Sequence, residues 1–256
     1  MSLISDALQG LSPGALAFCV AAMFVAAFIR GFTGFGSSLM WVPSLSLVLP
    51  PVAVVPITFL LEIGISLHLV PSVRREVDWP SLSRIWIGAF VGVPIGLALI
   101  ASMPADLTRG AVAVTVIVAA VLLWRGTRLK GTFGTPGTLG VGGAAGFLMG
   151  AVGIPGPPVF LYYLSVPLDT RIGRASIIAF IFGAAVIACA FASFRGMLDA
   201  TAAIRAALLL PIVVAGTYLG AHAFGRADPE KARRWALVVL MVMGAALLVR
   251  ALLAGR

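Results

Sequence analysis

The chain has 256 residues, of which 61% are hydrophobic and 11% are charged, and its mean hydropathy is +1.10. A soluble domain carries roughly 25% charged residues, so this composition excludes a water-soluble globule and leaves no room for a large catalytic domain outside a membrane. Lys and Arg number 18 against 9 Asp and Glu, a net charge of +9, which in a membrane protein indicates basic cytoplasmic loops rather than nucleic-acid binding.

Apolar runs separated by Gly, Pro and charged residues predict ten helical segments in an all-α polytopic membrane protein, because one span takes ~20 apolar residues. Their expected ranges are 12–30, 37–49, 52–70, 82–102, 107–124, 138–152, 157–168, 174–194, 200–224 and 230–253. A basic, glycine-rich connector, 125–137, divides them into two sets of five. Segments 37–49 and 157–168 would extend only about 20 Å and about 18 Å, which is too short for a hydrocarbon core of ~30 Å. Each of the two follows a glycine-rich break.

The two breaks resemble each other and indicate an internal duplication. The first reads GFTGFGSS from Gly31 and the second reads GAVGIPGP from Gly150, so Gly34 aligns with Gly153 at the same separation of 119 residues. A second match, at a separation of 124 residues, pairs the runs GVPIG and GTYLG at 92–96 and 216–220. Two matches in the same order, at nearly the same separation, favour two repeats over chance.

Five segments in each half make the two repeats, residues 1–130 and 131–256, inverted relative to each other in the membrane. Assigning alternate loops to alternate sides places most basic residues, among them Arg74, Arg75 and Arg125, on one side. The positive-inside rule makes this side cytoplasmic and puts both termini outside the cytoplasm. The N-terminus lacks the features of a cleaved signal peptide, so we expect a multi-pass protein of a bacterial-type cytoplasmic (inner) membrane. Inverted repeats with broken helices are typical of secondary transporters.

The breaks predict a binding site for a small anion. Non-helical backbone at membrane depth is tolerated where it lines a cavity, and the first N–H groups of a helix have no intrahelical partners and carry the positive end of the helix dipole. Two such ends could meet near the midplane and hold an anion. The alternative is close packing of helices through glycine. The residues of the breaks expected to bind the substrate are Gly31, Gly34, Gly36, Ser37, Ser38, Gly153, Pro155, Gly156 and Pro157.

The same stretches resemble a known transporter family. The runs GFTGFGSSLMWVP and GFLMGAVGIPGPPVFLYYL, each followed by a long helix, and the triplet Arg174-Ala175-Ser176 are similar to the two halves of the TauE/SafE (TSUP) family of membrane transporters. The resemblance covers nearly the whole chain. It implies transport of sulfur-containing anions such as sulfite, sulfoacetate or other organosulfonates, and members are also linked to other small anions and organic acids. Pro155 and the Pro157-Pro158 pair stand where the family often has further glycines, so the second break offers fewer backbone donors.

Ionisable side chains inside the apolar segments are further candidates, because a charge buried in a membrane is costly and usually functional. Arg30 borders the first break and could pair with a sulfonate or carboxylate; the alternative is a side chain that extends to the cytoplasmic surface. Glu62 lies centrally in its segment, with His68 about two turns further on. Burial favours the neutral carboxyl group and histidine titrates near neutrality, so both are candidates for proton coupling. An ion pair of Glu62 with an arginine would explain that carboxylate equally well.

Arg174, at the start of the segment 174–194, is either a gate for the substrate or a positive-inside residue.

The leading interpretation is a secondary transporter of small sulfur-containing anions that works by alternating access, with a passive anion channel and a transporter of a small carboxylate as alternatives. The sequence contains neither a Walker loop nor metal-ligand spacing, so we expect no enzymatic activity, no cofactor and no metal. The expected partners are the anionic substrate and the lipid bilayer, not nucleic acid. Both a monomer and a homo-oligomer are compatible with the sequence.

Overall fold

The computed structural model describes residues 12–33, 36–127, 133–223 and 229–254, and these residues contain helices and no strand. The ten helices in the described ranges are α2 (Pro13–Thr33), α3 (Ser37–Ser46), α4 (Pro51–Val73), α5 (Trp79–Ser102), α6 (Ala105–Trp124), α7 (Thr135–Val152), α8 (Gly156–Ser165), α9 (Thr170–Phe194), α10 (Ala200–Ala223) and α11 (Pro229–Ala254). The all-α fold class predicted from the hydropathy pattern is therefore confirmed.

The long helices have the length and the surface of membrane spans. Within the described residues, five helices are long and apolar enough to cross a bilayer, namely α2, α5, α6, α9 and α10. The outward face of α5 exposes Ile87, Val91 and Ile95, each more than half accessible, and α11 exposes Val242 and Leu253 in the same way. An apolar exterior of this extent is stable against lipid chains rather than water. Both observations agree with a polytopic membrane protein.

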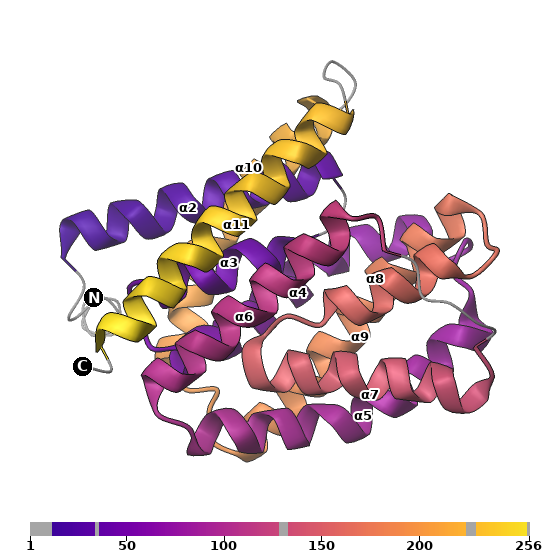
Figure 1. The fold of residues 1–256 in the computed structure, drawn as a ribbon, viewed down its shortest axis with the longest axis horizontal. Helices are drawn as coiled ribbons and strands as arrows, with labels where there is room; N and C mark the ends of the chain where they lie inside the picture. Colours follow the sequence, from indigo (N-terminus) through magenta and orange to yellow (C-terminus); the bar gives the residue numbers. More distant parts are fainter. Residues whose placement is uncertain (1–11, 34–35, 128–132, 224–228, 255–256) are drawn as a thin grey trace.

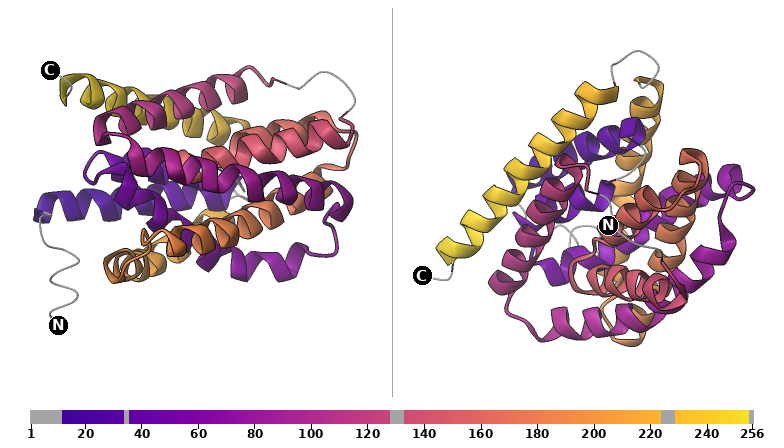
Figure 2. Two further views of the ribbon diagram at one scale, coloured as in Figure 1. Left: turned by 90° about the horizontal axis from the view of Figure 1, so that it is seen from below. Right: turned by 45° about the vertical axis from the view of Figure 1, so that its right-hand side comes forward.

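The packing of the helices has a two-part pattern. α2 begins and α11 ends at the same end of the molecule (Figure 1). α5 packs against α7 and α10 packs against α2, so each set of five places its fourth helix on the first helix of the other set. α4 packs against α9, and α6 lies beside α11 (Figure 2). These contacts map onto each other when the two sets are exchanged, as an internal duplication would produce.

The helix bounds repeat in the same way. α3 and α8 each have 10 residues and begin at Ser37 and Gly156, while α4 and α9 begin at Pro51 and Thr170. Both pairs of starts are 119 residues apart, the separation at which the two breaks align. The start expected at residue 174 was therefore wrong by four residues. The Asp169 carboxylate caps α9 by accepting the Arg171 N–H at 2.7 Å, which begins the helix one turn earlier.

Glycine seams join the helices that cross between the two sets. A Cβ added at Gly92 of α5 would overlap the carbonyl oxygen of Gly143, and one added at Gly150 of α7 would overlap that of Val93. On the other side, a Cβ at Gly220 of α10 would overlap the carbonyl oxygen of Phe28 in α2. The glycines in 92–96 and 216–220 thus allow backbones to approach closely. Gly150 belongs to this seam and not to the break that follows it, so the packing alternative holds at that position.

The short helix α3 lies in the interior. All ten of its residues are buried, and it contacts α2, α4, α6 and α11, which surround it in the ribbon (Figure 1). Ten residues extend about 15 Å, so α3 covers about half of the ~30 Å hydrocarbon thickness. Its first residue, Ser37, is buried inside the protein.

Candidate functional site

Both short helices begin immediately after a glycine-containing break. Gly36 precedes α3 in the left-handed conformation, with φ of 85°. Gly153 ends α7 in the same conformation, with φ of 70°, and its N–H donates to the Met149 carbonyl at 2.9 Å. L-residues with a side chain rarely adopt this conformation. Among the described residues, no side chain caps the start of α3 or α8. The first N–H groups of a helix have no intrahelical partner, but in α8 Pro157 and Pro158 have no N–H to offer.

The two helix starts meet at one small cavity. Gly36 and Ser38 line it from the start of α3, and Gly156 and Pro157 line it from the start of α8. Leu39, Leu123, Phe160, Ile177 and Ile181 complete the lining. A Cβ added at Gly156 would meet nothing within 4 Å, which shows that this glycine faces open space. The two breaks, far apart in the sequence, therefore border the same site.

This cavity is narrow and mostly apolar. A water-sized sphere finds about 20 Å³ of space in it, which is room for about one water molecule. Among the lining residues, Ser38 alone has a polar side chain, and it is buried. Polar recognition in this cavity would therefore come from the Ser38 hydroxyl and from backbone N–H groups.

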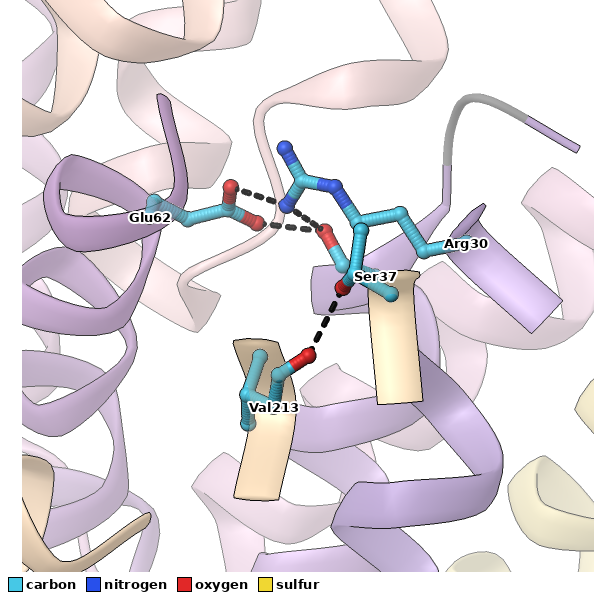
Figure 3. A network of polar contacts seen from close by, with 5 residues as sticks. Arg30, Ser37, Glu62 and Val213 are labelled. Carbon is cyan, nitrogen blue, oxygen red and sulfur yellow. Dashed lines mark hydrogen bonds and ion pairs between the residues drawn. The ribbon is translucent and has the colours of Figure 1, made fainter. Parts of the chain in front are cut away.

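A charged network lies behind the first turn of α3. One terminal nitrogen of the Arg30 guanidinium donates to Glu62 Oε2 and to Ser37 Oγ, each at 2.6 Å, and Ser37 Oγ donates to Glu62 Oε1, also at 2.6 Å. Arg30, Ser37 and Glu62 come from α2, α3 and α4 and point toward one another (Figure 3). Arg30 is 4% exposed and Glu62 1% exposed. Each of the three side chains thus hydrogen-bonds to the other two inside the protein.

The burial of Arg30 excludes a side chain that extends to the cytoplasmic surface. The guanidinium also lies over the ring of Trp41, 5.8 Å from its centroid, a cation–π contact that further holds the charge. Two explanations were open for Glu62, namely proton coupling and an ion pair with an arginine. The ion pair is present, and its partner is Arg30. Removing one member of a buried pair typically costs about 3–5 kcal/mol, because the other charge is left without a partner.

Helix α10 covers this network from a further side. Figure 3 draws Val213 of α10, which is fully buried, and its carbonyl oxygen accepts the Thr217 hydroxyl at 2.8 Å. α10 packs against both α2 and α4, the helices that carry Arg30 and Glu62. The ion pair is therefore enclosed by α2, α3, α4 and α10.

Two buried polar groups next to the network have no hydrogen-bond partner among the described residues. They are the indole Nε1 of Trp41 and the hydroxyl of Ser66. Trp41 follows Ser37 by one turn of α3, and Ser66 follows Glu62 by one turn of α4, so each shares a helix face with a member of the network. Buried groups of this kind usually have a partner, and the described protein atoms supply none to these two.

The opposite end of α3 is held by two arginines. Arg109 of α6 donates from Nε to the Ser46 carbonyl at 3.1 Å and also pairs with Asp106 at 2.6 Å. Arg250 of α11 donates to the Leu47 carbonyl. Cations at the C-terminal carbonyls of a helix satisfy unpaired acceptors and oppose the negative end of its dipole. This places α3 between two fixed ends, one at the ion pair and one at these caps.

The remaining sequence-predicted residues are not all part of this arrangement. Gly31 lies in the last turn of α2, which continues to Thr33, so this glycine is helical and precedes the break. Gly34 and the side chain of His68 lie outside the described residues. Pro155 caps α8 without lining the cavity. Arg174 is exposed on α9 and does not line the cavity either.

The triplet around Arg174 has a structural role at its third residue. The Ser176 hydroxyl is fully buried and accepts the Asp78 N–H at 2.9 Å, which ties α9 to the loop before α5. The side chains that sequence reasoning missed are Leu39, Trp41, Leu123, Phe160, Ile177 and Ile181. Ile177 and Ile181 are spaced by one helical turn, and Trp41 lies one turn after Ser37. This helical spacing could have grouped them with the breaks.

Within the described residues, no group of His, Cys, Asp and Glu is placed to hold a metal ion. The cysteines, Cys19 and Cys189, are both free and lie in α2 and α9.

Comparison with known proteins agrees with this architecture. The family model described as "Sulfite exporter TauE/SafE" matches residues 19–247. A curated relative named "Probable sulfite/organosulfonate exporter TauE", from Cupriavidus necator, is 28% identical over 237 residues, which cover 88% of this chain and 89% of the relative. No solved structure matches the chain. The matched region includes both breaks, the ion pair and the cavity, and the family is one of transporters rather than enzymes. The chain belongs to the TauE/SafE family of membrane transporters.

Proposed function

We propose that this protein transports a small sulfur-containing anion, such as sulfite, sulfoacetate or another organosulfonate, across the cytoplasmic membrane by alternating access. The observation that carries the proposal is the cavity at which the N-terminal ends of α3 and α8 meet. Free N–H groups and the positive ends of two helix dipoles favour an anion at that position. The relative's name adds the sulfite and organosulfonate class.

The two sides of the cavity would bind different parts of the substrate. The start of α3 provides the Ser38 hydroxyl and N–H groups, whereas Pro155 and Pro157 remove N–H donors from the start of α8. Phe160, Ile177 and Ile181 offer an apolar wall. A sulfonate group would face α3, and a short organic tail would face α8 and α9.

Alternating access requires parts that move around a central site, and the paired helix contacts support such parts. We infer that residues 1–130 and 131–256 are inverted repeats, because the contacts of α5 with α7 and of α10 with α2 exchange the two halves. The space of about 20 Å³ is too small for a sulfonate, so substrate binding would widen the cavity. With the basic loops inside, both termini would lie outside the cytoplasm.

Substitution of the cavity serine tests the binding site. Ser38→Ala should raise the Kd of methanesulfonate or sulfite roughly 10- to 150-fold, because a hydrogen bond to a charged group contributes about 1.5–3 kcal/mol. The matched control is Ser83→Ala, since Ser83 is exposed on α5 and bonds only to its own helix through the Pro80 carbonyl. The measurement is thermal stabilisation of the purified protein by an anion series, followed by flux into proteoliposomes.

The same series separates the alternatives. If short carboxylates raised the melting temperature of the protein and sulfonates did not, the substrate would be a carboxylate rather than a sulfonate. An electrical current far larger than any saturable flux would indicate a passive channel. If neither Ser38→Ala nor Ser83→Ala changed the anion affinity of an active protein, the cavity would not be the binding site.

A further inference from the structure

The ion pair behind α3 carries a net charge of zero, and this property has a consequence for an anion bound next to it. Ser37 belongs to the network with Arg30 and Glu62, and the next residue, Ser38, lines the cavity. We propose that Glu62 takes up one proton each time an anion binds in the cavity, so that anion and proton are transported together. This inference rests on the proposed function and specifies what drives it.

Charge balance inside the protein is the first argument. With Arg30 and Glu62 both charged, an arriving anion adds an uncompensated negative charge to a buried site, which is costly at membrane depth. A proton on Glu62 leaves Arg30 as a net positive charge, and the anion then neutralises it. Binding of the proton and binding of the anion therefore strengthen each other, and this coupling is reciprocal.

Ser37 provides the link at the level of atoms. In the structure the Ser37 hydroxyl donates to Glu62 Oε1. A proton added to Oε1 makes the carboxyl group the donor, and Ser37 Oγ becomes the acceptor. The Ser37 hydrogen is then free to turn away from Glu62, toward an anion bound at the first turn of α3. No covalent bond other than that to the transferred proton forms or breaks, and the proton leaves Glu62 when the anion departs.

The surroundings of Glu62 favour this single coupling. Arg30 is the one charged side chain that contacts it among the described residues. The other described charged or titratable side chains on the helices around α4 are Cys19 in α2, Arg84 in α5, Asp106 and Arg109 in α6, Tyr162 and Tyr163 in the adjoining α8, Arg171, Arg174 and Cys189 in α9, and Arg205, Tyr218 and His222 in α10. The buried Ser66 hydroxyl, one turn from Glu62 on α4, has no hydrogen-bond partner among the described residues.

Flux measurements in proteoliposomes test the coupling. Methanesulfonate is the probe, because it carries one negative charge throughout the neutral range and brings no proton of its own. We expect the wild-type protein to move one proton with each methanesulfonate in the same direction. A pH gradient should drive uptake, and a potassium diffusion potential should not, because the transported pair is neutral. Because each bound anion takes up one proton, the Kd for methanesulfonate should rise with pH, by at most tenfold per pH unit.

Glu62→Gln keeps the shape and the hydrogen bonds of a protonated carboxyl group. This variant should retain methanesulfonate binding but lose its pH dependence, move no protons and become driven by the membrane potential. Ser83→Ala should resemble the wild type.

The outcomes separate the coupling from the transport function. Wild-type transport that follows the membrane potential without proton movement would overturn the coupling and leave anion transport in place. Proton movement at the wild-type stoichiometry by Glu62→Gln would also overturn it. If the wild-type protein moved neither methanesulfonate, sulfite nor sulfoacetate, the proposed function itself would fail. Because the wild-type protein alone decides between neutral and electrogenic transport, the test does not depend on the folding of a variant.

Discussion

The starts of α3 and α8 have the same position in the two halves of the chain but opposite chemistry. Residues 119 apart pair Arg30 with Met149, Ser38 with Pro157, Trp41 with Phe160, Thr58 with Ile177 and Glu62 with Ile181. In the first half this set contains the ion pair. In the second half Pro157, Phe160, Ile177 and Ile181 line the cavity. At equivalent positions of the two proposed repeats, the first half thus carries charged residues and the second half apolar ones.

The two short helices also differ in how firmly they are enclosed. All residues of α3 are buried, whereas the buried residues of α8 are Pro157, Val159, Leu161, Tyr162 and Tyr163. An apolar groove runs beside α8, lined by Val118 of α6, Ala144 of α7 and Leu161 of α8. The charged half of the site is therefore held rigidly, and the apolar half has room to move.

Replacing the ion pair by the residues found 119 positions later gives the largest expected effect. Arg30→Met alone should lower the free energy of unfolding by about 3–5 kcal/mol, because Glu62 is left buried without its partner. The double variant Arg30→Met/Glu62→Ile should recover most of that loss, since an apolar pair often replaces a buried ion pair at little cost. Thermal unfolding in detergent measures both.

The double variant should fold and yet fail to bind the anion. If it bound methanesulfonate as tightly as the wild-type protein, the charged half of the site would be purely structural. If the double variant were no more stable than Arg30→Met, the stability lost with Arg30 would not come from leaving Glu62 unpaired. Either result would break the comparison between the two halves.

Glycine substitutions in the second break should have an intermediate effect. Gly153→Ala places a side chain at φ of 70°, which costs about 1–2 kcal/mol, and its Cβ would lie 3.1 Å from the Thr58 hydroxyl. Gly156→Ala meets no neighbour and should preserve stability, but its methyl group enters the cavity and should reduce anion flux. The control Gly196→Ala has φ of 67° in the turn after α9, where an added Cβ would meet nothing within 4 Å and no lining residue is bonded to it. It should lose stability without losing transport. If flux fell in this control as well, the loss in Gly156→Ala would not show that the anion binds in the cavity.

Trimming the apolar wall should have the smallest effect on stability and a selective effect on transport. Ile181→Val removes one methyl group at a cost of about 0.5–1.5 kcal/mol and widens the cavity beside α8. Transport of ethanesulfonate relative to methanesulfonate should rise roughly tenfold, the discrimination that one methylene group supports. Ile178→Val, a buried neighbour outside the cavity lining, should leave the ratio unchanged. An equal change in both variants would argue against the apolar wall as a selector.

Much of the fold was predictable because local signals decide it. Apolar runs, prolines and glycines placed the short helices at 37–49 and 157–168, and α3 and α8 begin at Ser37 and Gly156. The errors lie at glycine, which can either end a helix or be accommodated within one. Gly31 was expected to break the chain, but α2 continues through it, because a single glycine costs a helix only about 1 kcal/mol.

The site was less predictable than the fold, because its contacts join distant parts of the chain. Arg30 and Glu62 were both recognised as buried candidates, yet their mutual pairing depends on how α2 packs near α4. Ile177 and Ile181 carry no chemical signal of their own, since isoleucine in an apolar helix has a packing role by default. Arg174 was selected from its motif, but it is exposed on α9 and does not line the cavity.

The glycine seams between α5 and α7 and between α10 and α2 determine which parts can shift as units. Backbone atoms at these seams touch without intervening side chains, so the paired helices have no rotamers to readjust and cannot separate in small steps. Each pair would travel as a single rigid body composed of one helix from either half of the chain. The parts that move when the cavity opens would then be these mixed helix pairs and not the two halves of the chain. α3 would stay in place, because its two ends are held by the arginine caps and by the ion pair.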